Sequence, residues 1–290
     1  MGEEIGIIAP ASPVIPSELQ AGIDLLESLG YKINMAPHIY DTHEYLAGDD
    51  DARLKDFHDM FMNSRVKAVF CARGGYGTLR FLDRIEFDLI RSHPKIIVGY
   101  SDVTALLIAL YQKAGLLTFH GPMVKEFSKN QDQNLKTLLN LIGSEKRMTF
   151  DFARGKSLRS GQATGTLLGG NLSLICHLVG TPYMPSLKGA LLFIEEKGEP
   201  LYRIDRMLTH LRLSHQLDGL SGLIAGTFEG CGDPESIDRI LLDTVSDRDI
   251  PVASGIPLGH GPENMTLPLG LKADLDTEQM TLSLLEPCVI

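Results

Sequence analysis

The stretch KIIVGYSDVTALLIALYQ, residues 95–112, changes its pattern of apolar residues halfway along. Its first part contains a short run of β-branched apolar residues, IIV, which is typical of a buried strand. From Val103 onward the apolar residues recur at the spacing of one face of a helix. The segment GYSD, residues 99–102, therefore joins a buried strand to a helix, and Ser101 stands at the junction.

Strand-like and helix-like segments also alternate on the N-terminal side of this junction. Ser17 is the expected N-cap of the first helix, which Gly30 should end. Apolar strands that alternate with helices predict a parallel sheet covered on both faces, and hence an open α/β domain over residues 1–125. The predicted strands are residues 5–9, 31–35, 66–75 (running into a glycine turn) and 95–100, and the predicted helices are residues 17–29, 49–64 and 77–85.

The rest of the chain differs in composition and in its pattern of apolar residues. Residues 126–159 are polar, contain one predicted helix, and are interpreted as a linker. Residues 160–290 combine glycine-rich, strand-like runs with a few helices, which predicts a second, mixed domain. The helices are expected from about residue 171 and at residues 201–213 and 237–246, with a strand at 220–225 and a β-hairpin at the C-terminal end.

Composition narrows the functional classes. The 290 residues carry a formal net charge of −10 and no long basic cluster, which argues against nucleic acid as a partner. No apolar run reaches the length of a membrane span, and the acidic N-terminus does not fit a signal peptide, so a cytoplasmic location is expected. The four cysteines are scattered and are interpreted as buried thiols. No metal-ligand pattern and no cofactor motif occurs, so neither is expected.

Ser101 has two interpretations. A serine at a tight strand-to-helix turn lies beside the free N–H groups of the new helix, as in the nucleophile elbow of α/β-hydrolases, although the second glycine of that motif is missing. Alternatively, Ser101 or Asp102 simply caps the helix. In open parallel sheets ligands bind beyond the carboxyl ends of the strands, where loop residues 10–13, 73–77 and 100–102 are expected to gather.

A serine nucleophile needs a base, and the base needs an orienting acid. His120 and His260 both lie in glycine- and proline-containing loops at strand ends, and either could serve. The acid is sought at Glu195 and Glu196, at the end of an apolar strand. Because side chains alternate along a strand, one of these carboxylates is expected in the core or cleft and the other in solvent. The turn RGGYG, residues 73–77, could supply N–H groups to a phosphate or to an oxyanion.

Seven ordered motifs resemble the LD-carboxypeptidase family of serine peptidases, which includes murein tetrapeptide carboxypeptidases and microcin C7 self-immunity peptidases. They cover nearly the whole chain: IIAPASP, ARGGYGTLRFLD, IVGYSDVTALLIAL, FHGPM, GTLLGGNLSLI, LLFIEEKGEPLYRIDRMLTHL and IPLGHGPENMTLPLG. The resemblance implies a Ser-Glu-His triad of Ser101, Glu195 and His260, with oxyanion-hole N–H groups from Asp102 and Gly75. It also implies an N-terminal domain of the glutamine-amidotransferase (flavodoxin-like) type, a smaller β-rich swivelling C-terminal domain, and a homodimer.

For a cytoplasmic member the implied reaction is release of the terminal D-alanine from murein tetrapeptide. Such a site must hold a free carboxylate, for which Arg73 is a candidate, and the charged groups of the third residue. Asn171 is a candidate substrate contact or helix cap, and Glu229 is a candidate partner for a substrate amine. The alternative is a microcin-type peptidase that accepts an aminoacyl-nucleotide. The chain has no tryptophan with which to stack a base, which favours the murein interpretation.

Overall fold

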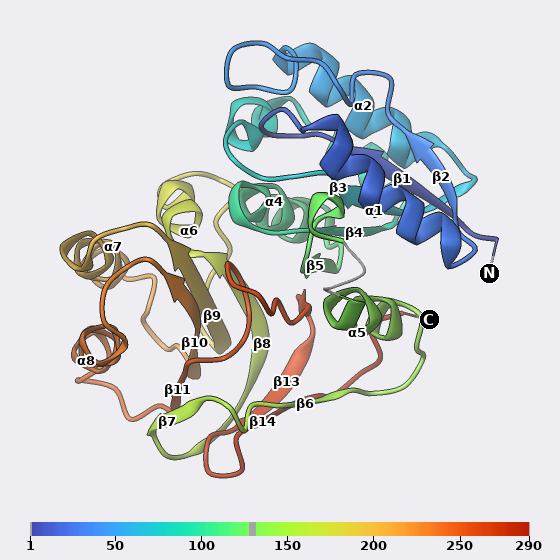
Figure 1. The fold of residues 1–290 in the computed structure, drawn as a ribbon. Helices are drawn as coiled ribbons and strands as arrows, with labels where there is room; N and C mark the ends of the chain where they lie inside the picture. The colour runs from blue at the N-terminus through green and yellow to red at the C-terminus, as the bar shows by residue number, and fades with distance from the viewer. Residues whose placement is uncertain (1, 128–131, 290) are drawn as a thin grey trace.

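Two β-sheets form the framework of the computed structural model, which describes residues 2–127 and 132–289. The sheet at the upper right of Figure 1 comes almost entirely from the first half of the chain, and the larger sheet at the lower left comes from the second half. The chain is therefore a mixed α/β protein in two parts. None of the helices in the described ranges is long and apolar enough to cross a membrane.

The first sheet confirms the four strands predicted from the N-terminus up to the GYSD segment, which are β1 to β4. Its strand order is β12-β5-β4-β3-β1-β2, with β1 to β5 parallel and β12 antiparallel to β5. The parallel strands bring their carboxyl ends, and the loops that follow, to one edge of the sheet. The bounds are β1 Glu4–Ile8, β2 Lys32–Met35, β3 Val66–Cys71, β4 Ile96–Gly99, β5 Thr118–His120 and β12 Leu267–Leu269.

Helices connect these strands, as the alternation predicts. The expected N-cap at Ser17 is wrong, because α1 begins at Pro16 and its N-cap, Ile15, makes no side-chain cap. Proline is well suited to the first helical position, since its fixed φ matches the helix and its missing N–H needs no partner there. The bounds are α1 Pro16–Ser28, α2 Asp50–Met62, the 3₁₀-helix η1 Thr78–Arg84, α3 Phe87–Ser92, η2 Ser101–Val103, α4 Thr104–Ala114 and η3 Val124–Glu126.

The second sheet has the strand order β6-β14-β13-β8-β9-β10-β11-β7. Its centre, β8 to β11, is parallel, and the flanking strands are antiparallel. The C-terminal hairpin is confirmed as β13 and β14. The bounds are β6 Thr149–Asp151, β7 Lys156–Arg159, β8 Gln162–Asn171, β9 Ala190–Lys197, β10 Gly222–Glu229, β11 Val252–Ser254, β13 Lys272–Asp276 and β14 Thr281–Leu284.

The segment expected to be a linker contributes to this second part. Strands β6 and β7 fall within residues 126–159 and form the two edges of the second sheet. The segment also contains α5, Asp132–Ile142, which is hydrogen-bonded through Asn134 to Pro262 and Asn264. The remaining helices are α6 Leu172–Leu178, α7 Leu201–Leu213 and α8 Pro234–Thr244.

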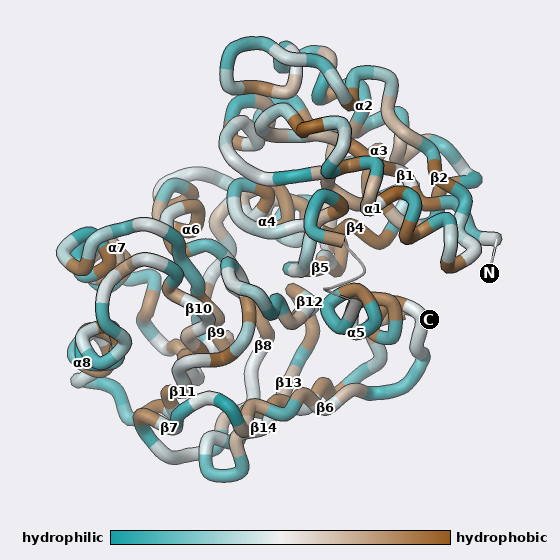
Figure 2. Tube along the Cα trace, viewed as in Figure 1, coloured by the Kyte–Doolittle hydropathy of each residue, from teal (hydrophilic) through white to brown (hydrophobic). Residues whose placement is uncertain are grey.

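Apolar residues concentrate on the strands and on the inner faces of the helices, whereas outer loops are hydrophilic (Figure 2). Strand β9 is an example, since its residues from Ala190 to Phe193 are all buried. A strand buried on both faces needs a continuous apolar run, and LLFI supplies it. The centre of the sheet is therefore apolar and buried up to Ile194, and it holds the side chains that follow in fixed positions.

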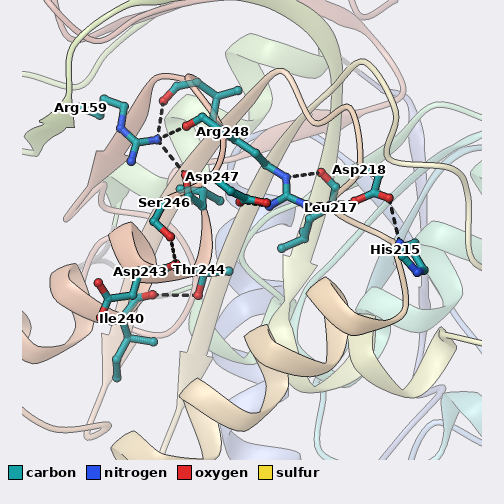
Figure 3. Close-up of polar contacts among 12 residues, drawn as sticks. Arg159, His215, Leu217, Asp218, Ile240, Asp243, Thr244, Ser246, Asp247 and Arg248 are labelled. Atoms are coloured by element: carbon teal, nitrogen blue, oxygen red, sulfur yellow. Dashed lines mark hydrogen bonds and ion pairs between the residues drawn. The ribbon is translucent and has the colours of Figure 1, made fainter.

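Polar contacts fix the far end of the second part (Figure 3). Arg159, on the edge strand β7, donates to the backbone carbonyls of Val245 and Arg248 after α8. Arg248 in turn pairs with Asp218 at 3.0 Å, and Asp218 accepts from His215 at 3.0 Å. These contacts satisfy carbonyls at the end of α8 that have no helical partner and tie the helix to the sheet edge.

The two parts meet beside Ser101. Helix α4 packs against α6 and β8, and the backbone N–H of Asn171 donates to the Thr104 hydroxyl at 3.1 Å. Gly170 has a φ of +137°, and a Cβ there would lie 2.6 Å from the Thr104 methyl group. Only glycine allows this approach, which joins the start of α4 to the end of β8.

Candidate active site

Ser101 occupies a strained turn directly after β4. Its φ is +60°, one of the few positive values outside glycine in the described chain. Such a conformation costs on the order of 1 kcal/mol or more for a non-glycine residue and tends to persist at functional sites. The hydroxyl makes no cap, since neither η2 nor α4 has a side-chain cap bond at its start. The capping interpretation of Ser101 is therefore wrong.

The turn after β3 faces this serine. A Cβ at Gly74 would lie 3.0 Å from Ser101 Cβ and 3.2 Å from its Oγ, so Gly74 closely approaches the hydroxyl. Gly75 has a φ of +113° and lies against Ser12, whose Oγ accepts from the backbone N–H of Tyr76 at 3.1 Å. The loops after β1, β3 and β4 thus meet at one place, as expected from the parallel strands.

Asp102 is buried and braces the same turn. Its carboxylate accepts from the Thr78 backbone N–H at 2.9 Å, and its carbonyl accepts from the Thr78 hydroxyl at 2.7 Å. Burial raises the pKa of the Asp102 carboxyl, although the bonds from Thr78 oppose that effect. The side chain of Asp102 therefore fixes η1 against η2, and its backbone N–H remains next to Ser101.

Glu195 and His260 lie 65 positions apart in the sequence but are in direct contact in the structure. Glu195 Oε2 lies 2.7 Å from His260 Nδ1 and accepts from the His260 backbone N–H at 3.1 Å. The carboxylate is fully buried. Burial acts to raise the pKa of Glu195, but the bond and charge of His260 outweigh it, so the pKa falls below its usual value. An ionised acid thus fixes which ring nitrogen faces away from it.

The expectation that one of the two adjacent glutamates faces solvent is wrong. Glu196 is also buried, and it accepts from Asn171 Nδ2 at 3.0 Å and from the Ser173 backbone N–H at 2.8 Å. Alternation does send the two side chains to opposite faces, but helix α6 covers the second face. Glu196 is the anchor for the start of α6.

Tyr100 connects the serine to the histidine. It immediately precedes Ser101, and its ring centroid lies 4.9 Å from that of His260. Its hydroxyl donates to Glu126 Oε1 at 2.5 Å, and burial raises the pKa of Glu126. The Ser101 hydroxyl and the His260 ring make no direct hydrogen bond within the described ranges, and such catalytic bonds often tighten only when substrate binds.

The loop that carries His260 is held by residues that sequence reasoning did not single out. Asn134, on α5, accepts from the backbone N–H of Asn264 at 3.1 Å and donates to the Pro262 carbonyl at 3.2 Å. The Asn264 side chain accepts from the Gly259 N–H at 2.8 Å. Gly259 has a φ of +90°, and a Cβ there would lie 2.4 Å from Glu195 Oε2. The glycine before His260 is thus required by both conformation and space.

A pocket of about 270 Å³ opens beside His260. Its wall carries two carboxylates, a lysine and two asparagines, which makes it polar and mixed in charge. The lining residues are Tyr100, Glu126, Asn134, Lys197, Glu229, His260, Gly261, Pro262 and Asn264. Glu229, proposed from the sequence as a substrate contact, therefore lies in the same pocket as the histidine. No cluster able to hold a metal ion occurs among the residues that the structure describes.

The other two sequence-derived contacts are less exposed. Arg73 is half-buried and donates through Nη1 to the Pro13 carbonyl at 2.8 Å, which ties the turn after β3 to the loop after β1. Asn171 is buried, and its Oδ1 accepts from the Leu174 backbone N–H at 3.2 Å as the N-cap of α6. The helix-cap role that the sequence allowed for Asn171 is confirmed.

Comparisons with known proteins agree with this geometry. Residues 5–121 match the model of the LD-carboxypeptidase N-terminal domain, and residues 164–275 match that of the C-terminal domain. The chain is 39% identical to a probable murein peptide carboxypeptidase of Bacillus subtilis, over 97% of this chain and 91% of that protein. It is 27% identical to the microcin C7 self-immunity protein MccF of Escherichia coli, over 99% and 94% of the two chains.

A solved structure gives the same result in three dimensions. The muramoyltetrapeptide carboxypeptidase of Oxalobacter formigenes superposes with a TM-score of 0.85 at 32% identity and covers 97% of both chains. The likeness extends over both sheets, so the two-part architecture is shared as a whole. With both family models matched in order, this chain belongs to the LD-carboxypeptidase family of serine peptidases.

Proposed function

We propose that this enzyme is a carboxypeptidase that releases the terminal D-alanine from murein tetrapeptide by cleaving the bond between an L-centre and that D-residue. Its triad would consist of Ser101 as nucleophile, His260 as base and Glu195 as the orienting acid. The observation that carries the proposal is the buried hydrogen bond of 2.7 Å between Glu195 and His260, next to the strained turn at Ser101. This pair supports the proposal, because serine hydrolysis requires an acid that orients the base beside the nucleophile.

The steps follow from these roles. His260 accepts the Ser101 proton as the oxygen attacks the scissile carbonyl, and Glu195 stabilises the imidazolium that forms. The oxyanion would rest on backbone N–H groups of Asp102 and Gly75. His260 then donates its proton to the leaving amine of D-alanine, and water releases the peptide from Ser101. Every step is an ordinary proton transfer or acyl transfer by groups of this chain.

The pocket beside His260 supports a charged third residue in the substrate. Glu229 would pair with a substrate amine there, with Glu126 and Lys197 as further charges in the same wall. The free carboxylate of the terminal D-alanine would be held by Arg73, whose turn adjoins Ser101. Asn171 would act only indirectly, because it is buried and caps α6.

The murein substrate is favoured over the aminoacyl-nucleotide alternative by two observations. The relative at 39% identity is named as a murein peptide carboxypeptidase, whereas MccF shares 27%. The chain also contains no tryptophan, which is the strongest side chain for stacking a base.

We further propose that residues 1–125 and 160–290 form the bulk of two domains, with β12 returning to the first and β6 and β7 added to the second. The first domain would be of the flavodoxin-like, glutamine-amidotransferase type. The strand order β2-β1-β3-β4-β5 supports this assignment, since it is the flavodoxin-like order. The second domain would be of the swivelling type. A cytoplasmic homodimer is proposed on the family resemblance, and analytical ultracentrifugation of the purified chain tests the dimer.

The test of function is a comparison of two substrates. Purified enzyme is incubated with a murein tetrapeptide ending in D-alanine and, separately, with an aminoacyl sulfamoyl adenylate, and products are followed by mass spectrometry. Release of D-alanine only, lost in Ser101→Ala, is the expected result, since removing the nucleophile lowers turnover by several powers of ten. Cleavage of the nucleotide conjugate alone would show that the enzyme is a microcin-type peptidase instead. An active Ser101→Ala would exclude the triad.

A further inference from the structure

Buried polar atoms without a hydrogen-bond partner gather around Glu195. They are Glu195 Oε1, both ring nitrogens of His120, Asn264 Nδ2 and Thr266 Oγ1, and elsewhere in the described chain only the Nε atoms of Arg53 and Arg73 share this state. Buried polar atoms are nearly always hydrogen-bonded because an unpaired one is costly, so five of them at one place indicate a partner they share.

The chain topology brings these groups to the same spot. His120 pairs with Leu267 across β5 and β12, and a Cβ on its neighbour Gly121 would lie 2.7 Å from Thr266 Oγ1. On β9, Phe193 and Glu195 project to the same face, and the Phe193 ring lies 5.2 Å from the His120 ring. His120 is therefore next to the strand face that carries the acid.

His120 itself is fixed and neutral. It is almost completely buried, and its ring centroid lies 5.7 Å from that of Tyr100 and 5.2 Å from that of Phe193. Burial lowers the pKa of His120 to about 4, so the ring carries one donor nitrogen and one acceptor nitrogen at neutral pH. A ring held only for packing needs neither of these nitrogens.

One oxygen of Glu195 lacks a hydrogen-bond donor, and His120 has a ring N–H without an acceptor. Both bonds from His260 go to Oε2, and Oε1 receives none. A carboxylate held at one oxygen is free to rotate about that contact, whereas a second donor fixes its plane and so the orientation of the imidazole. His120 and Glu195 make no direct hydrogen bond. One buried water would join them, and Thr266 Oγ1, also without a partner, would give that water the usual number of bonds.

We propose that His120 is a positioning residue for the Glu195–His260 pair, donating a ring N–H toward Glu195 Oε1 through one buried water. The proposal rests on the proposed triad. Its chemistry is the orientation of an acid by an outer-shell donor, which typically changes activity about 10- to 100-fold when removed. The other titratable groups around the pair are Tyr100, whose ring lies against His260, and Glu126, Lys197 and Glu229 in the wall of the neighbouring pocket.

The experiment compares three variants of the full chain. His120→Phe keeps a ring between Tyr100 and Phe193 but has no nitrogen, whereas His120→Asn and His120→Gln each restore an amide donor, at the positions of Nδ1 and Nε2 respectively. Each is treated with a fluorophosphonate, which labels an activated serine whatever the peptide substrate is. The labelling rate is measured against pH, and thermal melting shows that each variant is folded.

We expect His120→Phe to label about 10- to 100-fold more slowly, with one of the two amide variants regaining most of the rate. The acid limb of its pH profile should also move to higher pH, because a carboxylate that loses a donor attracts the imidazolium more strongly. If His120 were only structural, the variants would have lower melting temperatures. The acid limb of the pH profile would not move, and His120→Asn and His120→Gln would label at the same rate.

Wild-type rates and pH profile in a folded His120→Phe would overturn the proposal, as would equal loss in all three folded variants. If His120→Phe does not fold, the contrast between the Asn and Gln variants still decides. Failure of wild type to label would refute the triad and this inference together. Labelling without release of D-alanine would refute only the proposed substrate.

Discussion

Glu195 accepts two hydrogen bonds from a single residue, His260, one from the ring at 2.7 Å and one from the backbone at 3.1 Å. The backbone bond fixes the position of the loop relative to the acid, and the ring bond fixes the side chain. Both bonds end on the same buried oxygen, so the loop and the imidazole are held to one atom of β9, while Oε1 takes no part. The ring nitrogen that faces away from Glu195 is then available to a serine.

Replacing the acid by its amide should remove most activity. In Glu195→Gln the amide presents a donor to Nδ1 and favours the wrong tautomer of His260, so kcat should fall roughly 10⁴-fold. Steady-state D-alanine release measures the effect. The matched control is Glu196→Gln, the next buried carboxylate on β9, which should lower the melting temperature by weakening the start of α6 while keeping turnover within about tenfold. Equal losses in the two variants would contradict the assigned roles.

Gly259→Ala should disrupt the same contact from the backbone side. Its Cβ would lie 2.4 Å from Glu195 Oε2, and its φ is +90°, so the collision adds to backbone strain of about 1–2 kcal/mol. We expect loss of activity with a clear drop in stability, measured by D-alanine release and urea unfolding. Gly180→Ala is the control, because Gly180 has a φ of +84° and nothing within 4 Å of its Cβ position. It should show the strain alone, with activity kept.

His120 should make stability depend on pH in mild acid. Its pKa is about 4 in the folded chain against a usual value of 6.5, so the unfolded state binds the proton more readily between these values. The free energy of unfolding should therefore fall by up to about 3 kcal/mol as the pH drops from 6.5 to 4, and stay level below that as far as this group is concerned. Urea unfolding at several pH values tests it. His120→Phe should lack this component, and identical pH slopes in the two proteins would contradict it.

Tyr100→Phe should separate the ring contact with His260 from the hydrogen bond to Glu126. The variant keeps the ring but leaves Glu126 Oε1 without its donor at 2.5 Å, which should destabilise the fold by about 1–3 kcal/mol. Because Glu126 lines the pocket beside His260, KM should rise more than kcat falls. Tyr40→Phe, on an exposed ring, is the control and should change neither. A purely kcat effect in Tyr100→Phe would place the tyrosine in the chemical step instead.

The sequence predicts the strand-to-helix junction at Ser101 because the change of apolar period is local. It also predicts β1 to β4 of the first sheet, whose apolar runs are short and separated by turn residues, but neither β5 nor β12. The burial of Glu196 escapes prediction because it depends on α6 covering the second face of β9. Likewise, the support of the His260 loop by Asn134 joins residues 130 positions apart, and no local pattern in either segment signals that contact.

Sequence reasoning from the residues alone also leaves His120 and His260 equivalent. Both stand in glycine- and proline-containing loops, and only tertiary structure separates them. His260 receives an acid partner and lines a pocket, whereas His120 is enclosed between two aromatic rings. The distinction arises from packing between strands that are distant in sequence, and so it has no signature in spacing.

Strand β12 begins seven residues after His260 and completes the edge of the sheet that bears Ser101. A fragment ending near residue 125 would therefore leave β5, Thr118–His120, as an exposed edge strand with unpaired backbone groups. Such edges recruit other chains and aggregate. The first half of this protein should thus be a poor candidate for separate expression, and a bipartite version would need the segment after His260 to be supplied in trans.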